Sequence, residues 1–184
     1  MEMEDKMKKI SKETAERVAE AFNKAVLTND NGEIDIKDKR FILVETGDYP
    51  YGLGDAGSLR PVLYRQGMQV GKNIVEILND VMKQESVEET VDNTLGFLVF
   101  SGYGLFELVS ETEEEIVVRL HNSFEVDSYK RNFDKPADQP VCHFTRGILG
   151  EVFSELKGKP VRVEETTCAA MGGSYCEFKI TPME

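Results

Sequence analysis

Hydrophobic positions recur at helical spacing along two stretches in the first half of the chain. The first stretch predicts a helix that Ser11 caps and that runs to about Leu27. The second covers residues 58–82 and predicts a long helix with Pro61 in its first turn. Between them, residues 34–44 alternate only in part, which is typical of one strand or of a bent pair of strands.

Two further helices are predicted in the second half. Ser86 and Glu89 form a capping box for a helix that runs to about Phe97. The other is expected to begin at Asp138 as its cap, with Pro140 in the first turn, and to end at the sequence GKP.

Four segments outside these helices favour β structure. FSGYGLFELVSE at 100–111 indicates a turn into a strand, and EEEIVVRLHNSFEV at 113–126 indicates its hairpin partner. VRVEETTC at 161–168 and SYCEFKI at 174–180 predict a second hairpin. The order α-β-α-α-β-β-α-β-β therefore predicts an α+β fold, with a mixed, largely antiparallel sheet packed with helices.

The charge balance excludes two classes of partner. The 184 residues suit one domain, and 22 basic against 34 acidic residues give a net charge of −12. Because no basic patch is available to neutralise phosphates, we expect no direct contact with nucleic acid. No apolar run approaches the roughly 20 residues of a membrane span, and the N-terminus lacks a secretory signal, so we expect no membrane association and a cytoplasmic location.

The sequence GLGDAG at 52–57 matches a dinucleotide-binding pattern, but its surroundings do not fit. In a dinucleotide fold the following helix returns to a parallel strand that ends in an acidic residue, whereas here a second helix is predicted to follow. We therefore interpret the glycines as a flexible loop that allows a helix to approach closely.

The C-terminal hairpin and the helix before it bring a group of polar side chains together. Because side chains alternate along a strand, Glu165 points inward with the apolar residues of its strand. Cys176 shares an inward face, Cys168 lies near the turn, and Cys142 lies on the apolar side of the helix. The four side chains converge if the helix packs on the hairpin. Three interpretations remain open from the residues alone: a metal site, three buried thiols that only pack, or a disulfide between Cys168 and Cys176.

The segment VCHFTRGILGEVFSELKGKPVRVEETTCAAMGGSYCEFKI at 141–180 resembles the C-terminal half of a 4-vinyl reductase-type domain. YRQGMQVGKNIVEIL, SGYGLFEL and LHNSFE, upstream of it, are also similar to that family. The family includes proteins linked to bacteriochlorophyll synthesis, archaeal hydrocarbon-binding proteins and the sensor domains of phenol-responsive regulators. The resemblance implies a ligand-binding domain over residues 34–184, preceded by an N-terminal helix and connection at 1–33. It also implies a fold related to nitric oxide sensors and vesicle-tethering subunits, and a homodimer.

The resemblance also implies a zinc site. Phenol sensors hold zinc with Cys, Glu, Cys and Cys, and the matching residues here are Cys142, Glu165, Cys168 and Cys176. Four protein ligands leave no open position for water, so such a zinc would stabilise the domain and would not catalyse a reaction.

The effector pocket of the phenol sensors is matched less well. The chain has no tryptophan, and Leu120 stands where a pocket tryptophan would match, so phenol itself is not expected to bind. We still expect a mostly apolar pocket, because small-molecule sites are apolar with a few polar anchors. His121 is either such an anchor or a strand residue facing solvent. The expected pocket residues are Tyr64, Phe97, Phe100, Tyr103, Phe106 and His121.

The leading hypothesis is a non-enzymatic module that binds or senses a small hydrophobic or aromatic molecule. Any signal is then expected to pass through dimer contacts or a separate partner. The alternatives are an enzyme or accessory protein that acts on a tetrapyrrole vinyl group, and a scaffold for protein assembly. We find no trusted nucleotide motif and no spare cysteines for an iron–sulfur cluster, which disfavours a reductase.

Overall fold

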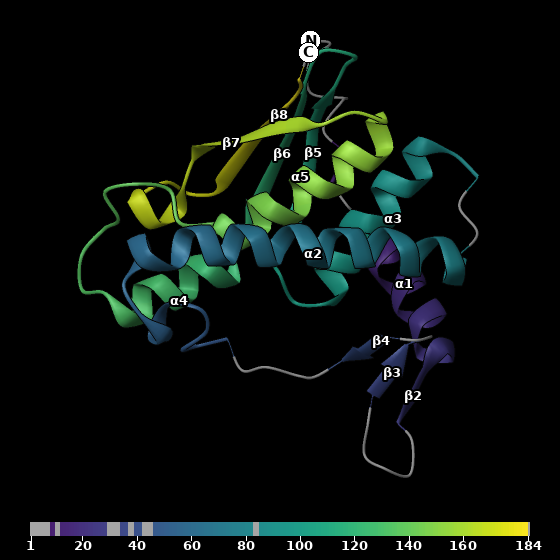
Figure 1. Ribbon diagram of the computed structural model, residues 1–184, viewed down its shortest axis with the longest axis horizontal. Coiled ribbons are helices and arrows are strands. Elements are labelled where there is room, and N and C mark those ends of the chain that lie inside the picture. The colour runs from purple at the N-terminus through teal and green to yellow at the C-terminus, as the bar shows by residue number, and fades with distance from the viewer. Residues whose placement is uncertain are drawn as a thin grey trace.

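The predicted α+β fold is confirmed by the computed structural model (Figure 1), which describes residues 8–9, 12–28, 34–36, 39–41, 46–82 and 85–183. The helices are α1 (Lys12–Ala25), α2 (Ala56–Met82), α3 (Val87–Phe100), α4 (Phe124–Asn132) and α5 (His143–Lys157), with short 3-10 turns η1 (Tyr51–Leu53) and η2 (Ala169–Met171). The strands are β1 (Lys8–Lys9), β2 (Val26–Thr28), β3 (Ile34–Ile36), β4 (Lys39–Phe41), β5 (Leu105–Glu111), β6 (Ile116–His121), β7 (Val161–Thr167) and β8 (Cys176–Pro182).

Five of the described strands form the main sheet, in the order β1-β5-β6-β8-β7, and each neighbouring pair is antiparallel. Both predicted hairpins, β5–β6 and β7–β8, are therefore confirmed. The strands β2, β3 and β4 form a separate small antiparallel sheet, so residues 34–44 contain a bent pair of strands. The predicted domain boundary at residues 33/34 falls between β2 and β3 of this small sheet and stays a prediction.

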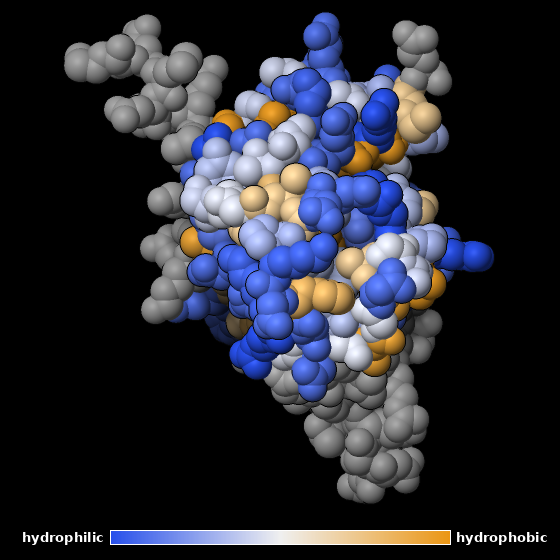
Figure 2. Space-filling model, turned by 90° about the vertical axis from the view of Figure 1, so that its left-hand side faces the viewer, coloured by the Kyte–Doolittle hydropathy of each residue, from blue (hydrophilic) through white to orange (hydrophobic). Residues whose placement is uncertain are grey.

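The helices cover one face of the main sheet. In Figure 1, α5 lies along β7 and β8, α2 runs beside α5, and α3 lies against β5 with α1 packed on it. The sheet meets them with its apolar side chains, and the buried ones include Phe106, Val118, Leu120, Phe178 and Ile180. On the face shown in Figure 2, hydrophobic side chains are scattered among charged ones.

Glycines let α2 and α5 touch at their backbones. A Cβ atom added to Gly67 would lie 2.0 Å from the carbonyl oxygen of Phe144, and one added to Gly147 would lie 2.1 Å from that of Tyr64. Both separations are far shorter than van der Waals contact, so no other residue fits without moving the helices apart. We call Gly67 and Gly147 the glycine crossing.

The helix at residues 86–100 begins as predicted. Ser86 Oγ accepts a hydrogen bond from the amide of Glu89 at 3.1 Å. The Glu89 carboxylate accepts from the amide of Glu85 at 3.1 Å, one residue before the partner of a standard capping box. The predicted cap of the first helix, Ser11, lies outside the described residues.

Two predictions about helix starts were wrong. The strand predicted to run to residue 126 ends at His121, and α4 follows, with Ser123 as its N-cap. Asp138 does not cap the next helix, because α5 begins at His143 and its N-cap is Cys142. Pro140 therefore lies in the connection between α4 and α5, not in a first turn.

Candidate metal centre and adjoining hollow

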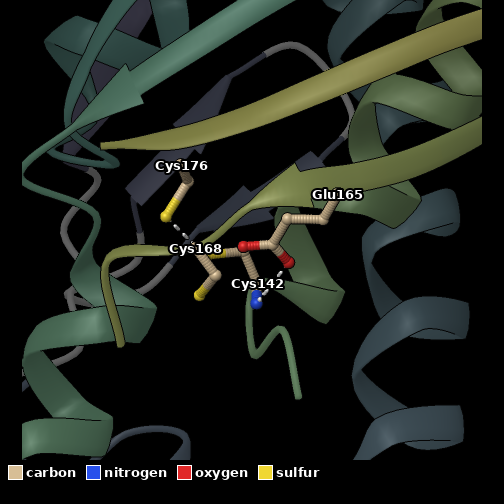
Figure 3. Close-up of side chains that lie close together, drawn as sticks. All are labelled: Cys142, Glu165, Cys168 and Cys176. Atoms are coloured by element: carbon tan, nitrogen blue, oxygen red, sulfur yellow. Dashed lines mark hydrogen bonds between the residues drawn. The ribbon is translucent and has the colours of Figure 1, made fainter. Parts of the chain in front are cut away.

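Four side chains meet where α5, β7 and β8 come together. Cys142 is the N-cap of α5, Glu165 lies on β7, Cys168 follows β7, and Cys176 begins β8 (Figure 3). One ligand atom from each lies within 4.8 Å of the others, and all four residues are buried. The predicted convergence is therefore confirmed.

A β-bulge explains how two ligands of one segment face the same way. Glu165 pairs with Phe178 on the inner face of the sheet, as its place in the alternation predicts. Thr167, and not Thr166, pairs with the next residue of β8, so Thr166 is the extra residue of the bulge. Without that residue, alternation would turn Cys168 outward. With it, the Cys168 thiol returns to the buried side beside Glu165.

A distant carboxylate replaces the missing cap of α5. Cys142 makes no side-chain cap hydrogen bond. Instead, Glu125 of α4 accepts hydrogen bonds from the amide of Phe144 at 2.8 Å and from the amide and hydroxyl of Thr145 at 2.9 and 2.8 Å. A carboxylate at this end also suits the positive pole of the helix dipole. Glu125 thus caps the helix and leaves the Cys142 thiol free to join the cluster.

Hydrogen bonds within the cluster satisfy only part of its polar atoms. The amide of Cys142 donates to Glu165 Oε2 at 3.1 Å, and the amide of Ala169 donates to Cys176 Sγ at 3.5 Å. The Sγ atoms of Cys142 and Cys176 lie 3.4 Å apart, and all three cysteines are free thiols. Glu165 Oε1 is buried and has no hydrogen-bond partner among the described residues. A buried oxygen without a partner is costly, which marks this as a place for a cation.

The protonation of the cluster follows from its burial. Burial, followed by the negative charge of Cys168, raises the pKa of Glu165 to about 9. Burial likewise raises the pKa of the Cys142 thiol, whereas hydrogen bonds from Cys142 and Cys176 lower the pKa of Cys168. Without a metal, the buried group therefore retains most of its protons. A divalent cation would replace those protons, because thiolates and carboxylates bind metals in their deprotonated forms.

The donor set narrows the kind of metal. Three thiolates and one carboxylate from four protein residues suit a tetrahedral, closed site, and soft sulfur ligands favour zinc over magnesium or calcium. Each of the four ligands is supplied by the chain itself, so the arrangement is one of structural metal sites.

The aromatic residues expected to form a pocket lie in different parts of the fold. Phe97 and Phe100 of α3 pack around Phe22 of α1, with ring centroids 4.7 and 6.3 Å from that of Phe22. Phe106 is fully buried on β5. Tyr103 follows α3 and stacks against Phe144 of α5 at 6.0 Å.

His121 lies at the end of β6, on the face of the sheet opposite the helices. Its Nε2 atom is 3.2 Å from Glu107 Oε2, and its side chain is 34% exposed. A half-exposed strand histidine with a carboxylate partner is close to the second of its two predicted roles. The pocket formed by these aromatic residues stays a prediction.

A hollow of about 490 Å³ opens beside the metal cluster, between α2, α5 and β7. Of the predicted pocket residues, Tyr64 alone lines it. Its lining consists of Tyr64, Pro140, Arg146, Val161, Arg162, Val163, Glu164, Glu165 and Met183. Sequence reasoning missed Arg146, although it follows Cys142 by one helical turn on the same side of α5.

The chain was compared with known families and proteins. Residues 116–182 match the model of the V-4-R (vinyl-4-reductase) domain. An uncharacterised protein of Methanocaldococcus jannaschii is 34% identical over 47 residues, a match that spans 26% of each chain. The chain therefore covers about a quarter of the length of that relative.

Two solved structures resemble the fold. The phenol-responsive sensory domain of the transcription activator PoxR, solved with phenol, has a TM-score of 0.77 at 18% identity, over 92% of this chain and 89% of that one. A vinyl-4-reductase family protein from M. jannaschii has a TM-score of 0.51 at 17% identity, over 96% and 97%. These matches confirm the predicted family resemblance. Within the described residues, no helix is long and apolar enough to cross a membrane.

Proposed function

We propose, taking the match of residues 116–182 to the vinyl-4-reductase domain as the premise, that this protein is a non-enzymatic sensory module. It binds a small hydrophobic or aromatic molecule and carries a structural zinc ion. The observation that carries the proposal is the similarity of fold to the phenol-responsive domain of PoxR over 92% of the chain. The hollow beside α5 supports it, since its volume lies in the range of small-molecule sites, about 300–1,000 Å³.

Zinc is supported by the chemistry of the cluster. Cys142, Glu165, Cys168 and Cys176 would hold the ion, and its charge would compensate for the removal of their protons in a buried site. The ion would tie the start of α5 to the β7–β8 hairpin and so fix one wall of the hollow, to which Glu165 belongs.

Elemental analysis tests the zinc. Protein purified without added metal should contain close to one zinc per chain, and C176S should lose most of it. The control is I180V, because Ile180 is buried on the same strand and is not a ligand. Metal-free wild-type protein with normal stability would contradict the proposal.

Native mass spectrometry tests the binding function. The protein should carry or accept a small aromatic molecule at a ratio of one per chain, and the extracted compound would identify the chemical class. Turnover of a vinyl substrate by the protein alone would contradict the non-enzymatic assignment. Light scattering in the same preparation checks the proposed homodimer, which should have twice the chain mass of 20.8 kDa.

A further inference from the structure

Arg146 is an unusual side chain for the wall of an apolar pocket. It extends from α5 into the lining of the hollow, and its Cζ atom lies 5.5 Å from the centroid of the Tyr64 ring. Its Nε atom is buried and has no hydrogen-bond partner in the described part of the chain. A buried guanidinium N–H without an acceptor is costly, so the site is incomplete without an acceptor.

The other charged groups of the hollow do not neutralise Arg146. Arg162 and Glu164 form an ion pair with each other at 3.8 Å. Glu165 directs its carboxylate into the metal cluster, where Oε2 accepts from the amide of Cys142 (Figure 3). None of the ion pairs between described residues includes Arg146. The chain carries a net charge of −12, so leaving an arginine unpaired is not explained by a shortage of acidic residues.

The rest of the lining is mainly apolar. Val161 and Val163 face the hollow from β7, Met183 and Pro140 lie at its margin, and the Tyr64 ring covers one face of the guanidinium. A guanidinium stacked on an aromatic ring keeps its N–H groups in the ring plane, which is the geometry for a two-pronged contact with a carboxylate. The hollow thus places one positive charge beside apolar walls.

We propose that the hollow binds a small organic carboxylate, with the carboxylate on Arg146 and an apolar or aromatic body against Val161 and Val163. This inference rests on the proposed binding function and gives its ligand a charge. It also separates this protein from a sensor of neutral phenols, because a neutral ligand would leave the guanidinium without a counter-charge.

Calorimetric titration of the full chain tests the inference with benzoate, its neutral isostere benzamide, and phenol. Benzoate should bind at least about 10-fold more tightly than benzamide, because a charge-assisted pair is worth about 1.5–3 kcal/mol. R146Q should abolish that preference, and R146K should retain part of it. The matched control is R65Q, since Arg65 is exposed on α2, does not line the hollow and loses the same charge.

A second measurement uses the unaltered protein and does not depend on the folding of a variant. Benzoate should shift the amide NMR signals of Val161 and Val163, and benzamide should shift them less. Equal binding of all three probes, or a benzoate preference that R146Q leaves unchanged, would overturn this inference and leave the binding function intact. Failure of every probe to bind would overturn the carboxylate site, whereas the binding function itself fails only if native mass spectrometry also finds no ligand.

Discussion

Two contacts of α5 with its neighbours are held by opposite means. At its N-terminus, α5 meets β7 and β8 through buried thiols and carboxylates, and Glu125 supplies the cap. About one turn further along is the glycine crossing, where α5 meets α2 without any intervening side chain. The first contact depends on charge, protons and a metal, whereas the second depends only on shape. Solution conditions should therefore act on the first and leave the second unchanged.

Removal of the metal should have the largest effect. A chelator should lower the free energy of unfolding by more than about 4 kcal/mol, because loss of a structural metal belongs to the most severe single changes. Denaturant titration with and without chelator measures the difference. C176S should be destabilised already and should respond little to chelator. A wild-type protein that is indifferent to chelator would show that the thiols only pack.

A methyl group at the glycine crossing should have the next largest effect. G147A places its Cβ 2.1 Å from the Tyr64 carbonyl oxygen and should cost about 3 kcal/mol through forced separation of the helices. G150A is the matched control on the same helix, since its Cβ would lie 3.5 Å from the nearest atom. That variant should be neutral or more stable by up to about 1 kcal/mol, from helix propensity. Equal losses in the two variants would refute the steric explanation, and both losses should be independent of chelator.

The smallest effect is a pH dependence at the polar end. Burial, followed by the positive charges of Arg146 and Arg60, lowers the pKa of His143 to about 4. Because this pKa is depressed, neutral His143 contributes stability above its unfolded value of 6.5, and the contribution is lost as pH falls from 6.5 through 4. The loss should reach about 1 kcal/mol at pH 5.5.

Unfolding curves at pH 7.5 and 5.5 measure that loss. H143Q should lose less stability than the wild type across this interval, while H121Q, at the exposed end of β6, should follow the wild type. An H143Q variant with the full wild-type loss would assign the acid sensitivity to other groups.

Local patterns in the sequence predicted part of the site. Alternation along β7 selected Glu165 over its neighbour because one face of the strand is buried, and parity alone decides which side chain lies there. It could not place Cys168, since a bulge at Thr166 reverses the parity and depends on pairing with β8. The position of Cys142 followed from helical spacing, although the N-cap of that helix lies four residues after the predicted cap.

The wrong helix starts have a common physical reason. Ser123 with acidic residues after it and basic residues near the end of α4 is a local helix signal, but the preceding strand alternation obscured it. The cap of α5 has no local signal, because Glu125 reaches its N-terminus from a different helix. Arg146 likewise gained its significance only when α2 and β7 came to lie beside it.

The position of β8 in the sheet gives the chain a particular order of assembly. β8 follows every other described strand along the chain, yet it lies between β6 and β7. During synthesis, β6 and β7 must therefore wait with open edges until β8 has left the ribosome, and Cys176 arrives with it. An edge left open in this way can pair with other chains. The main sheet and the metal cluster are thus completed in the same late step of synthesis, so a chain shortened before β8 would expose two unpaired strands and bind no metal tightly.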